Sequence, residues 1–146
     1  MTAIVVDLDG TLNNCSPRQH LAQAQKWDEF HGSLMDDLIN PDVKFLLDNI
    51  AAEIMVIGCT GRSNAFRSLT TRWLLDNRIL LDQLLMRPDG DWRPDHELKP
   101  KMLEKYLGSK DKVLRSVKFV LDDRDKVVEA WREYGLPCWQ VRPGGY

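Results

Sequence analysis

The sequence has few of the residues that build disulfide frameworks or zinc sites. Only three of its 146 residues are cysteines, they are widely spaced, and no two form a Cys-x-x-Cys pair: Cys15, Cys59 and Cys138. The three histidines have no metal-ligand spacing either: His20, His31 and His96. An odd number of isolated cysteines argues against a disulfide framework, and the lack of paired ligands argues against structural zinc. We therefore expect the cysteines to be reduced.

Long apolar runs and a strong charge of one sign are also missing. No apolar run approaches the roughly 18 residues that a membrane-spanning helix needs, and no basic region with a cleavage site opens the chain. We therefore expect a cytoplasmic protein without membrane contact. The formal net charge of −2 gives no global nucleic-acid signature. A length of 146 residues predicts a single domain, residues 1–146.

Short apolar runs alternate with amphipathic segments along most of the chain. The apolar runs predict five strands, within residues 3–6, 54–59, 80–86, 117–121 and 138–141. Apolar residues at helical spacing predict helices over residues 41–52, 64–77, 97–107 and 124–134. Asn40 is expected to cap the first of these helices, and Pro100 must lie in the first turn of the third. The alternation indicates an α/β fold with a doubly wound, Rossmann-like parallel sheet of five strands.

Residues 15–38 interrupt this alternation. Their helical period is weak, so we expect an irregular segment with one or two helical turns. The segment is too short for an independent cap domain. An alternative interpretation is a small helical lid insertion whose apolar face is formed by Trp27 and Phe30.

Charged residues follow the ends of the predicted strands, where a doubly wound sheet binds its ligands. Asp7 and Asp9 come directly after the first strand, and Asp122 and Asp123 end the fourth. Two carboxylates about 4 Å apart repel by roughly 4 kcal/mol at an effective dielectric constant near 20. A protein that holds such a pair together normally supplies a cation. Mg²⁺ fits, because it prefers oxygen ligands.

The segment Asp7-Leu-Asp-Gly-Thr11, placed after an apolar strand, resembles the first motif of the haloacid dehalogenase superfamily. The residues of the second, third and fourth motifs also follow in order: Thr60, Lys99 and Asp122-Asp123. The resemblance implies a phosphatase with the superfamily's fold and a minimal or small cap. In such an enzyme Asp7 is the nucleophile that forms an aspartyl-phosphate, and Asp9 is the general acid and base.

The same resemblance implies roles for the other motif residues. Three residues would hold the phosphate: Thr60, Gly61 and Lys99. The cofactor would be Mg²⁺, and its candidate ligands are Asp7, Asp9 and Asp122. Asp123 is a supporting residue that can join Asp7 and Asp122 around the ion.

A narrower resemblance, to the phosphatase half of phage polynucleotide kinase/3′-phosphatases, depends on residues outside these motifs. Ile39-Asn-Pro41, Leu121-Asp-Asp-Arg124 and the ending Cys138-Trp-Gln-Val141 carry it. It implies that Arg18 and Arg62 are cations on the phosphate side and that Asp95 orients Lys99. The chain has no Gly-x-x-x-x-Gly-Lys-Ser/Thr loop, so we expect any kinase or ligase activity to come from a separate partner.

Three functions agree with these residues. The first is a Mg²⁺-dependent phosphatase that removes 3′-terminal phosphates from DNA or RNA, and the second is a nucleotidase or other small-molecule phosphatase. The third, a non-catalytic module with the same fold, is disfavoured by the complete set of motif residues. The 3′-phosphatase function is favoured by a predicted basic rim, which would attract a phosphate backbone. Six arginines would form this rim: Arg18, Arg62, Arg87, Arg93, Arg124 and Arg142.

Overall fold

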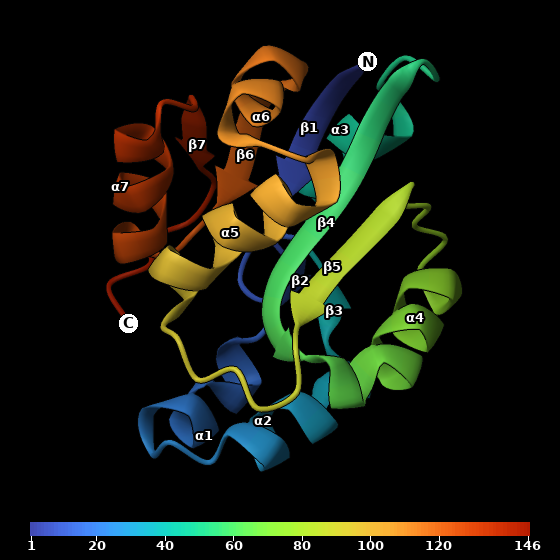
Figure 1. Cartoon of the computed structure of the whole chain (residues 1–146). Coiled ribbons are helices and arrows are strands. Elements are labelled where there is room, and N and C mark those ends of the chain that lie inside the picture. The colour runs from blue at the N-terminus through green and yellow to red at the C-terminus, as the bar shows by residue number, and fades with distance from the viewer.

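A five-stranded parallel sheet forms the centre of the computed structural model, which describes residues 1–146 (Figure 1). The strand order is β5-β4-β1-β6-β7, and every neighbouring pair is parallel. The strands are Thr2–Val6 (β1), Ile54–Ser63 (β4), Gln83–Arg87 (β5), Val117–Asp122 (β6) and Cys138–Gln140 (β7). The predicted doubly wound α/β fold is confirmed.

The central strand β1 lies at the point where the chain changes direction across the sheet. From β1 the chain moves to β4 and β5 on one side, and it then returns to β6 and β7 on the other. Ligands of doubly wound sheets bind beyond the carboxyl ends of the strands at such a point. Asp7, which follows β1 directly, therefore stands at the expected position for chemistry.

Helices cover both faces of the sheet. One face packs against α5 (Asp95–Leu107), α6 (Lys110–Ser116) and α7 (Asp125–Tyr134), and the other against α3 (Pro41–Asp48) and α4 (Arg67–Asp76) (Figure 1). Successive β1 residues alternate between two hydrophobic cores, with Ala3 and Val5 in one and Ile4 and Val6 in the other. This two-sided burial explains why β1 is a continuous apolar run. No helix is both long and apolar enough to cross a membrane.

Several helix boundaries differ from the sequence prediction. Helix α3 ends at Asp48, four residues early, where Asn49 Nδ2 donates to the Phe45 carbonyl at 2.8 Å. The Asn40 side chain does not cap α3, because its Nδ2 donates instead to the Thr11 carbonyl at 2.8 Å. Helix α5 begins at Asp95, directly after the extended Pro94. Pro100 therefore lies in the second turn of α5, and the prediction of a first-turn position is wrong.

The other helices follow the expected segments, with one addition. A 3₁₀ turn, Asn64–Phe66 (η3), precedes α4, and α7 ends at Gly135, which has a φ of +112°. Helix α6 lies in a stretch for which the sequence pattern predicted no element. The Ser109 side chain caps it by accepting from the Lys112 N–H at 3.2 Å.

Residues 15–38 form a small helical cap beside the carboxyl ends of β4 and β5 (Figure 1). The cap consists of η1 (Ser16–Arg18), α1 (Gln19–Gln23), α2 (Trp27–Gly32) and η2 (Leu34–Asp36). A two-stranded antiparallel pair, β2 (Asn13–Asn14) and β3 (Leu38–Ile39), joins it to the main body. Cys15, Ala22 and Phe30 form its own core. The segment is therefore helical, but Trp27 is 45% exposed and only Phe30 of the predicted pair belongs to this core. That the segment acts as a lid stays a prediction.

Candidate active site

The carboxyl ends of β1 and β6 bring a lysine and two carboxylates together. Asp7 follows β1, Asp122 ends β6, and Lys99 comes from α5. Lys99 Nζ lies 2.8 Å from Asp7 Oδ1 and 2.9 Å from Asp122 Oδ2. All three residues are buried, so these charge-assisted hydrogen bonds are shielded from water. The structure thus joins three predicted site residues from three elements.

Both carboxylate oxygens of Asp7 accept hydrogen bonds. Thr11 Oγ1 donates to Oδ2 at 2.9 Å, while Lys99 donates to Oδ1. Burial and repulsion from Asp122 raise the pKa of Asp7 well above its usual value. Burial alone would lower the pKa of Lys99, but Asp122 and Asp7 raise it, so this lysine is a cation. Thr11 was not among the predicted site residues, although it closes the first motif.

Asp123 joins Asp7 and Asp122 in a buried acidic cluster. One carboxylate oxygen from each of the three lies within 4.8 Å of the other two. Only Lys99 forms a salt bridge with the cluster, so two formal negative charges are left uncompensated. Burial and the neighbouring Asp122 raise the pKa of Asp123, although a hydrogen bond from Tyr146 opposes them. A set of carboxylate oxygens with excess negative charge fits a divalent cation such as Mg²⁺.

Gly10 and Tyr146 lie directly against Asp123. The Tyr146 hydroxyl donates to Asp123 Oδ2, and the Arg124 guanidinium lies 5.4 Å from the centre of the Tyr146 ring. Gly10 has a φ of +87°, and a Cβ there would lie 2.1 Å from Asp123 Oδ2. Only glycine suits that position. No sequence pattern indicates Tyr146, because its contact with Asp123 depends on how the last residues return over the site.

Asp9 lies outside the acidic cluster and is surrounded by donors. Arg62 Nε lies 2.9 Å from Asp9 Oδ2, and Arg62 Nη2 lies 2.6 Å from Oδ1. Arg18 Nη2 and Asn13 Nδ2 also donate to Oδ1, at 2.8 Å and 3.0 Å. The third member of the acidic cluster is Asp123, not Asp9. The Asp9 side chain therefore adds no oxygen to the acidic cluster, and the prediction that Asp9 is a metal ligand stays a prediction.

Arg18 and Arg62 are buried, with exposed fractions of 4% and 1%. Arg18 Nε also donates to Asp37 Oδ1 at 2.8 Å, and Arg62 Nη1 to Thr70 Oγ1 at 3.0 Å. Burial alone would raise the pKa of Asp9, but Arg62 and Arg18 hold it well below its usual range. The observed role of both arginines is to orient Asp9 as an anion. Their predicted contact with a substrate phosphate stays a prediction.

Thr60 and Gly61 lie inside β4 and not after its end, contrary to the prediction. The pairing of β4 with β5 shifts register between Thr60 and Ser63, as in a β-bulge. Thr60 Oγ1 accepts from the Arg62 N–H at 3.1 Å, so its own proton is free for a ligand. A Cβ on Gly61 would lie 2.2 Å from Asp95 Oδ1, so this close approach requires glycine.

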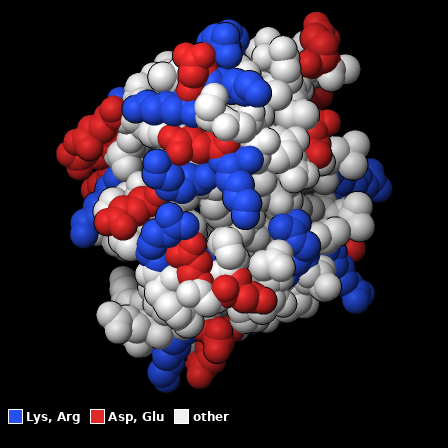
Figure 2. All heavy atoms as spheres, viewed as in Figure 1, with Lys and Arg blue, Asp and Glu red and all other residues white.

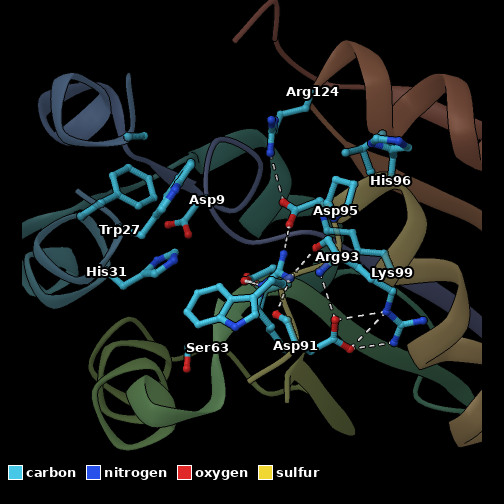
Figure 3. Close-up of a pocket in the computed structure, with 18 of the residues that line it drawn as sticks. Asp9, Trp27, His31, Ser63, Asp91, Arg93, Asp95, His96, Lys99 and Arg124 are labelled. Carbon is cyan, nitrogen blue, oxygen red and sulfur yellow. Dashed lines mark hydrogen bonds and ion pairs between the residues drawn. The ribbon is translucent and has the colours of Figure 1, made fainter. Parts of the chain in front are cut away.

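Asp95 forms its ion pairs with Arg87 and Arg124 and none with Lys99, so its predicted role in orienting Lys99 stays a prediction. Its Oδ1 lies 2.5 Å from Arg87 Nη2, and its Oδ2 lies 3.1 Å from Arg124 Nη1, a pair drawn in Figure 3. Asp95 begins α5, one turn before Lys99, where a carboxylate is favoured by the helix dipole. It therefore joins the chain after β5 to the chain after β6.

A cavity of about 390 Å³ lies over these residues. Six predicted site residues line it: Asp7, Asp9, Thr60, Gly61, Asp95 and Lys99. In Figure 3, Trp27 and His31 of the cap lie beside Asp9, across the pocket from Asp95 and Lys99. Arg18, Arg62, Asp122 and Asp123 do not line the cavity and support it from behind.

The six arginines do not form one basic rim. Arg142 pairs with Asp42 at 2.7 Å and lies outside the cavity lining. Arg87 and Arg124 share Asp95, and Arg93 pairs with Asp91 at 2.7 Å. Figure 2 shows acidic and basic side chains interspersed over the face that it presents. The prediction of a basic rim is therefore corrected, because each of these arginines has a carboxylate partner.

Comparisons with known proteins agree with this geometry. A viral relative, from Autographa californica nuclear polyhedrosis virus and named a bifunctional polynucleotide kinase/RNA ligase, is 28% identical over 138 residues, which are 92% of this chain and 18% of the relative. A chain in the structure of the Pnkp1/Rnl/Hen1 complex is 34% identical with a TM-score of 0.82, over 99% of this chain and 46% of that one. The chain thus spans less than half the length of these relatives.

The fold recurs in more distant hydrolases. A haloacid dehalogenase-like hydrolase from Streptococcus pneumoniae is 15% identical with a TM-score of 0.67, over 94% of this chain and 83% of its own. The family described as "Polynucleotide kinase PNKP phosphatase domain" matches residues 1–146. The chain therefore belongs to this family and is a phosphatase domain of the haloacid dehalogenase type.

Proposed function

We propose that the protein is a Mg²⁺-dependent phosphomonoesterase that removes 3′-terminal phosphates from DNA or RNA through an aspartyl-phosphate. The observation that carries the proposal is the position of Asp7, which lies at the base of a cavity with Lys99 Nζ 2.8 Å from its Oδ1. Asp7 is accessible to a phosphate only from that cavity, because its other surroundings are buried protein.

Asp7 acts as the nucleophile in the proposed reaction. A carboxylate oxygen of Asp7 forms a bond to phosphorus while the bond between phosphorus and the 3′ oxygen breaks. Hydrolysis of the resulting acyl phosphate by water returns Asp7 and releases inorganic phosphate. The hydrogen bonds from Thr11 and Lys99 fix the plane of the carboxylate before the attack.

The charges at the site suit an anionic substrate once a cation is present. Bound Mg²⁺ would be held by Asp7, Asp122 and Asp123 and would supply charge neutralisation at the phosphate. Lys99 adds a fixed positive charge at the same place, and the free hydroxyl proton of Thr60 can be donated to a phosphate oxygen. Together these groups let two anions, the phosphate and Asp7, approach each other.

Asp9 is the proposed general acid and base. It lines the cavity two residues beyond Asp7, and the arginine pair holds its carboxylate in one orientation. It would donate a proton to the departing 3′ oxygen and take one from the attacking water. Because the arginines stabilise its anion, the protonated form needs a partial release of these contacts when the substrate enters.

The choice of a polynucleotide end as substrate is supported by the relatives. The family is that of a polynucleotide kinase phosphatase domain, and the relatives carry the words kinase and RNA ligase in their names or stand in an RNA repair complex. We infer that this domain acts with a kinase and a ligase, in one chain or as a separate partner, to prepare broken ends for joining.

Phosphate release from four substrates tests the proposal. The protein with Mg²⁺ is given a 3′-phosphorylated oligonucleotide, a 5′-phosphorylated one, and free 3′- and 5′-mononucleotides. We expect the 3′-phosphorylated oligonucleotide to have the highest kcat/KM and a chelator to stop its turnover. A higher kcat/KM for mononucleotides would instead identify a nucleotidase.

The Asp7→Asn variant tests the covalent route. The amide is a poor nucleophile of nearly the same size, so phosphate release should be abolished while the fold is kept. Residual turnover above a few per cent of the wild-type rate would exclude the aspartyl-phosphate.

A further inference from the structure

The cavity has an aromatic wall that the proposed phosphate chemistry does not use. Trp92, between β5 and α5, is 88% exposed, the highest value among the large hydrophobic residues of the chain, and it lines the cavity. Trp27 of the cap also lines the cavity and is 45% exposed. An exposed tryptophan leaves a large apolar surface in water, so two of them at one cavity indicate a ligand that covers them.

Trp92 is exposed although its loop is firmly held. The Arg87 guanidinium donates to the carbonyl of Asp91 at 3.0 Å and to that of Arg93 at 2.5 Å, which are the residues on either side of Trp92. Arg87 Nε also donates to the Gly61 carbonyl at 2.8 Å. The Asp91 carboxylate accepts from the Arg93 N–H at 3.1 Å. The backbone therefore presents the indole to the cavity in a defined position, which lowers the entropy cost of binding.

Trp27 is held by aromatic neighbours within the cap. Its ring centre lies 5.8 Å from that of the buried Phe30 in an edge-to-face arrangement. It lies 6.2 Å from that of His31, with an angle of 25° between the planes. His31 in turn lies 5.6 Å from Phe66. These contacts leave part of the Trp27 indole facing the pocket, beside His31 in Figure 3.

His31 is a neutral and largely buried residue of this wall. The residue is 9% exposed and lines the cavity, and its Nδ1 is buried with no hydrogen-bond partner. Because this nitrogen is covered by protein, a ligand in the cavity contacts the exposed part of the ring and not Nδ1. Burial lowers the pKa of His31 to about 4, so the imidazole is neutral and does not act as a phosphate-binding cation.

These features describe a binding site for a planar ring. A nucleobase has this chemistry, and base–aromatic stacking tolerates every base because each has a π-face. The cavity of about 390 Å³ is within the usual size of small-ligand sites, roughly 300–1,000 Å³. Asp7 and Lys99 line the same cavity, so a phosphate at Asp7 and a base at the aromatic wall belong to one bound nucleotide.

We propose that Trp92 and Trp27 form a stacking subsite for the base of the terminal nucleotide. The proposal rests on the proposed function, because it requires a nucleotide phosphate at Asp7. It makes Trp92 a specificity-determining residue: the subsite selects nucleotide phosphates over other phosphate esters.

The test uses two 3′-phosphorylated oligonucleotides. One is complete, and the other is identical except that its terminal nucleotide has no base. Trp92→Ala should lower kcat/KM for the complete oligonucleotide roughly 5- to 150-fold, the effect of losing one base–aromatic stack. The loss for the abasic end should be much smaller. Trp92→Phe, which keeps a ring, should restore most of the activity. Phe45→Ala is the matched control, because Phe45 is 70% exposed and does not line the cavity.

Equal losses of Trp92→Ala on both ends, or no loss on either, would overturn the subsite. Failure of the proposed function has a different outcome. The wild-type protein would then hydrolyse p-nitrophenyl phosphate but release no phosphate from a 3′-phosphorylated end. In that case the Asp7→Asn variant is titrated with the complete oligonucleotide while tryptophan fluorescence is followed. Binding that Trp92→Ala abolishes would still support the subsite, and an absence of binding would overturn it.

Discussion

Arg62 holds both carboxylate oxygens of Asp9, with Nε 2.9 Å from Oδ2 and Nη2 2.6 Å from Oδ1. Such a bidentate pair fixes the position and the plane of the carboxylate. Arg62 is 1% exposed, and Asp9 lines the cavity, so the pair connects the interior to the place where a substrate would lie. Arg18 reaches the same carboxylate from the cap, at 2.8 Å, and therefore ties the cap to the proposed acid.

The first prediction concerns the proton that Asp9 is proposed to transfer. Asp9→Asn should slow esters with poor leaving groups, such as 3′-phosphorylated ends, by roughly 10²–10⁴-fold, the usual contribution of a general acid. It should slow p-nitrophenyl phosphate far less, because that leaving group needs little protonation. Steady-state rates on the two substrates check this. Asp48→Asn, at an exposed aspartate, is the control, and equal losses on both substrates would remove Asp9 from the role.

The second prediction concerns the acidic cluster. Saturating Mg²⁺ at 100 times its Kd stabilises a protein by roughly 2.7 kcal/mol, which corresponds to roughly 5–10 °C in Tm for a domain of this size. Asp123→Asn should lose most of this Mg²⁺-induced shift, because one of the three grouped carboxylates is gone. Without Mg²⁺ its Tm should be unchanged or higher, since a repelling charge is removed.

Thermal unfolding with and without Mg²⁺ measures both effects. The control is Asp42→Asn, which also removes one carboxylate, but an exposed one that pairs with Arg142 outside the cavity. If Asp123→Asn showed the same Mg²⁺-induced rise in Tm as the wild type, Asp123 would not be a ligand of the ion.

The sequence was sufficient for the parts of the protein that depend on local pattern. The apolar strands predict where β1 and β6 end, and parallel strands bring their carboxyl ends to one edge. That topology brings Asp7 and Asp122 together, whereas the contact of Lys99 with both depends on how α5 packs. Thr60 was also placed at the site, although β4 continues through it to Ser63.

The sequence does not predict the side-chain pairings that depend on tertiary contacts. Asp37 pairs with Arg18 across 19 residues of weakly patterned sequence, and Tyr146 reaches Asp123 only because the last residues return over the site. The family resemblance assigns Asp95 to Lys99, whereas the ion pairs of Asp95 are with arginines from two other segments. Such pairings are decided by packing, which no spacing in the chain records.

The third prediction concerns His31 and the pH dependence of stability. Burial lowers its pKa from 6.5 to about 4 in the folded protein. Between these values the unfolded chain binds a proton that the folded protein does not, so stability is full above pH 6.5 and falls as the pH drops towards 4. A difference of this size corresponds to a loss on the order of 3 kcal/mol.

Urea unfolding at several pH values between 4.5 and 7.5 measures this loss. The His31→Gln variant has no titrating group at this position, so its free energy of unfolding should fall less over the same range. Parallel curves for the two proteins would contradict the prediction. The other titrating groups change the free energy of unfolding of both proteins by the same amount. Their contribution therefore cancels when the two proteins are compared.

The last prediction concerns Arg87 and Arg93, two arginines that the sequence analysis assigned to the same basic rim. The Arg87 side chain is 16% exposed and holds Asp95 together with the backbone around Trp92, whereas the Arg93 side chain is 49% exposed and pairs only with Asp91. Because half of the Arg93 side chain is exposed, it can meet a backbone phosphate beyond the reacting one although it is paired with Asp91. Arg93→Ala should raise KM for a 3′-phosphorylated oligonucleotide roughly two- to fivefold, the effect of one exposed ion pair, and barely change a mononucleotide.

Arg87→Ala should instead lower kcat/KM roughly 10- to 100-fold on both substrates. Without Arg87, Asp95 and the backbone around Trp92 would be displaced, and any phosphate ester in the cavity would then be misplaced. Arg72→Ala is the control, since its side chain is 76% exposed and belongs to α4, away from the cavity lining. Added salt should weaken the oligonucleotide selectively in the wild type and less so in Arg93→Ala, because one phosphate contact has been lost. If Arg93→Ala affected both substrates equally, Arg93 would have no role in binding a polymer, and the preference for polynucleotide ends would have to come from the aromatic wall alone.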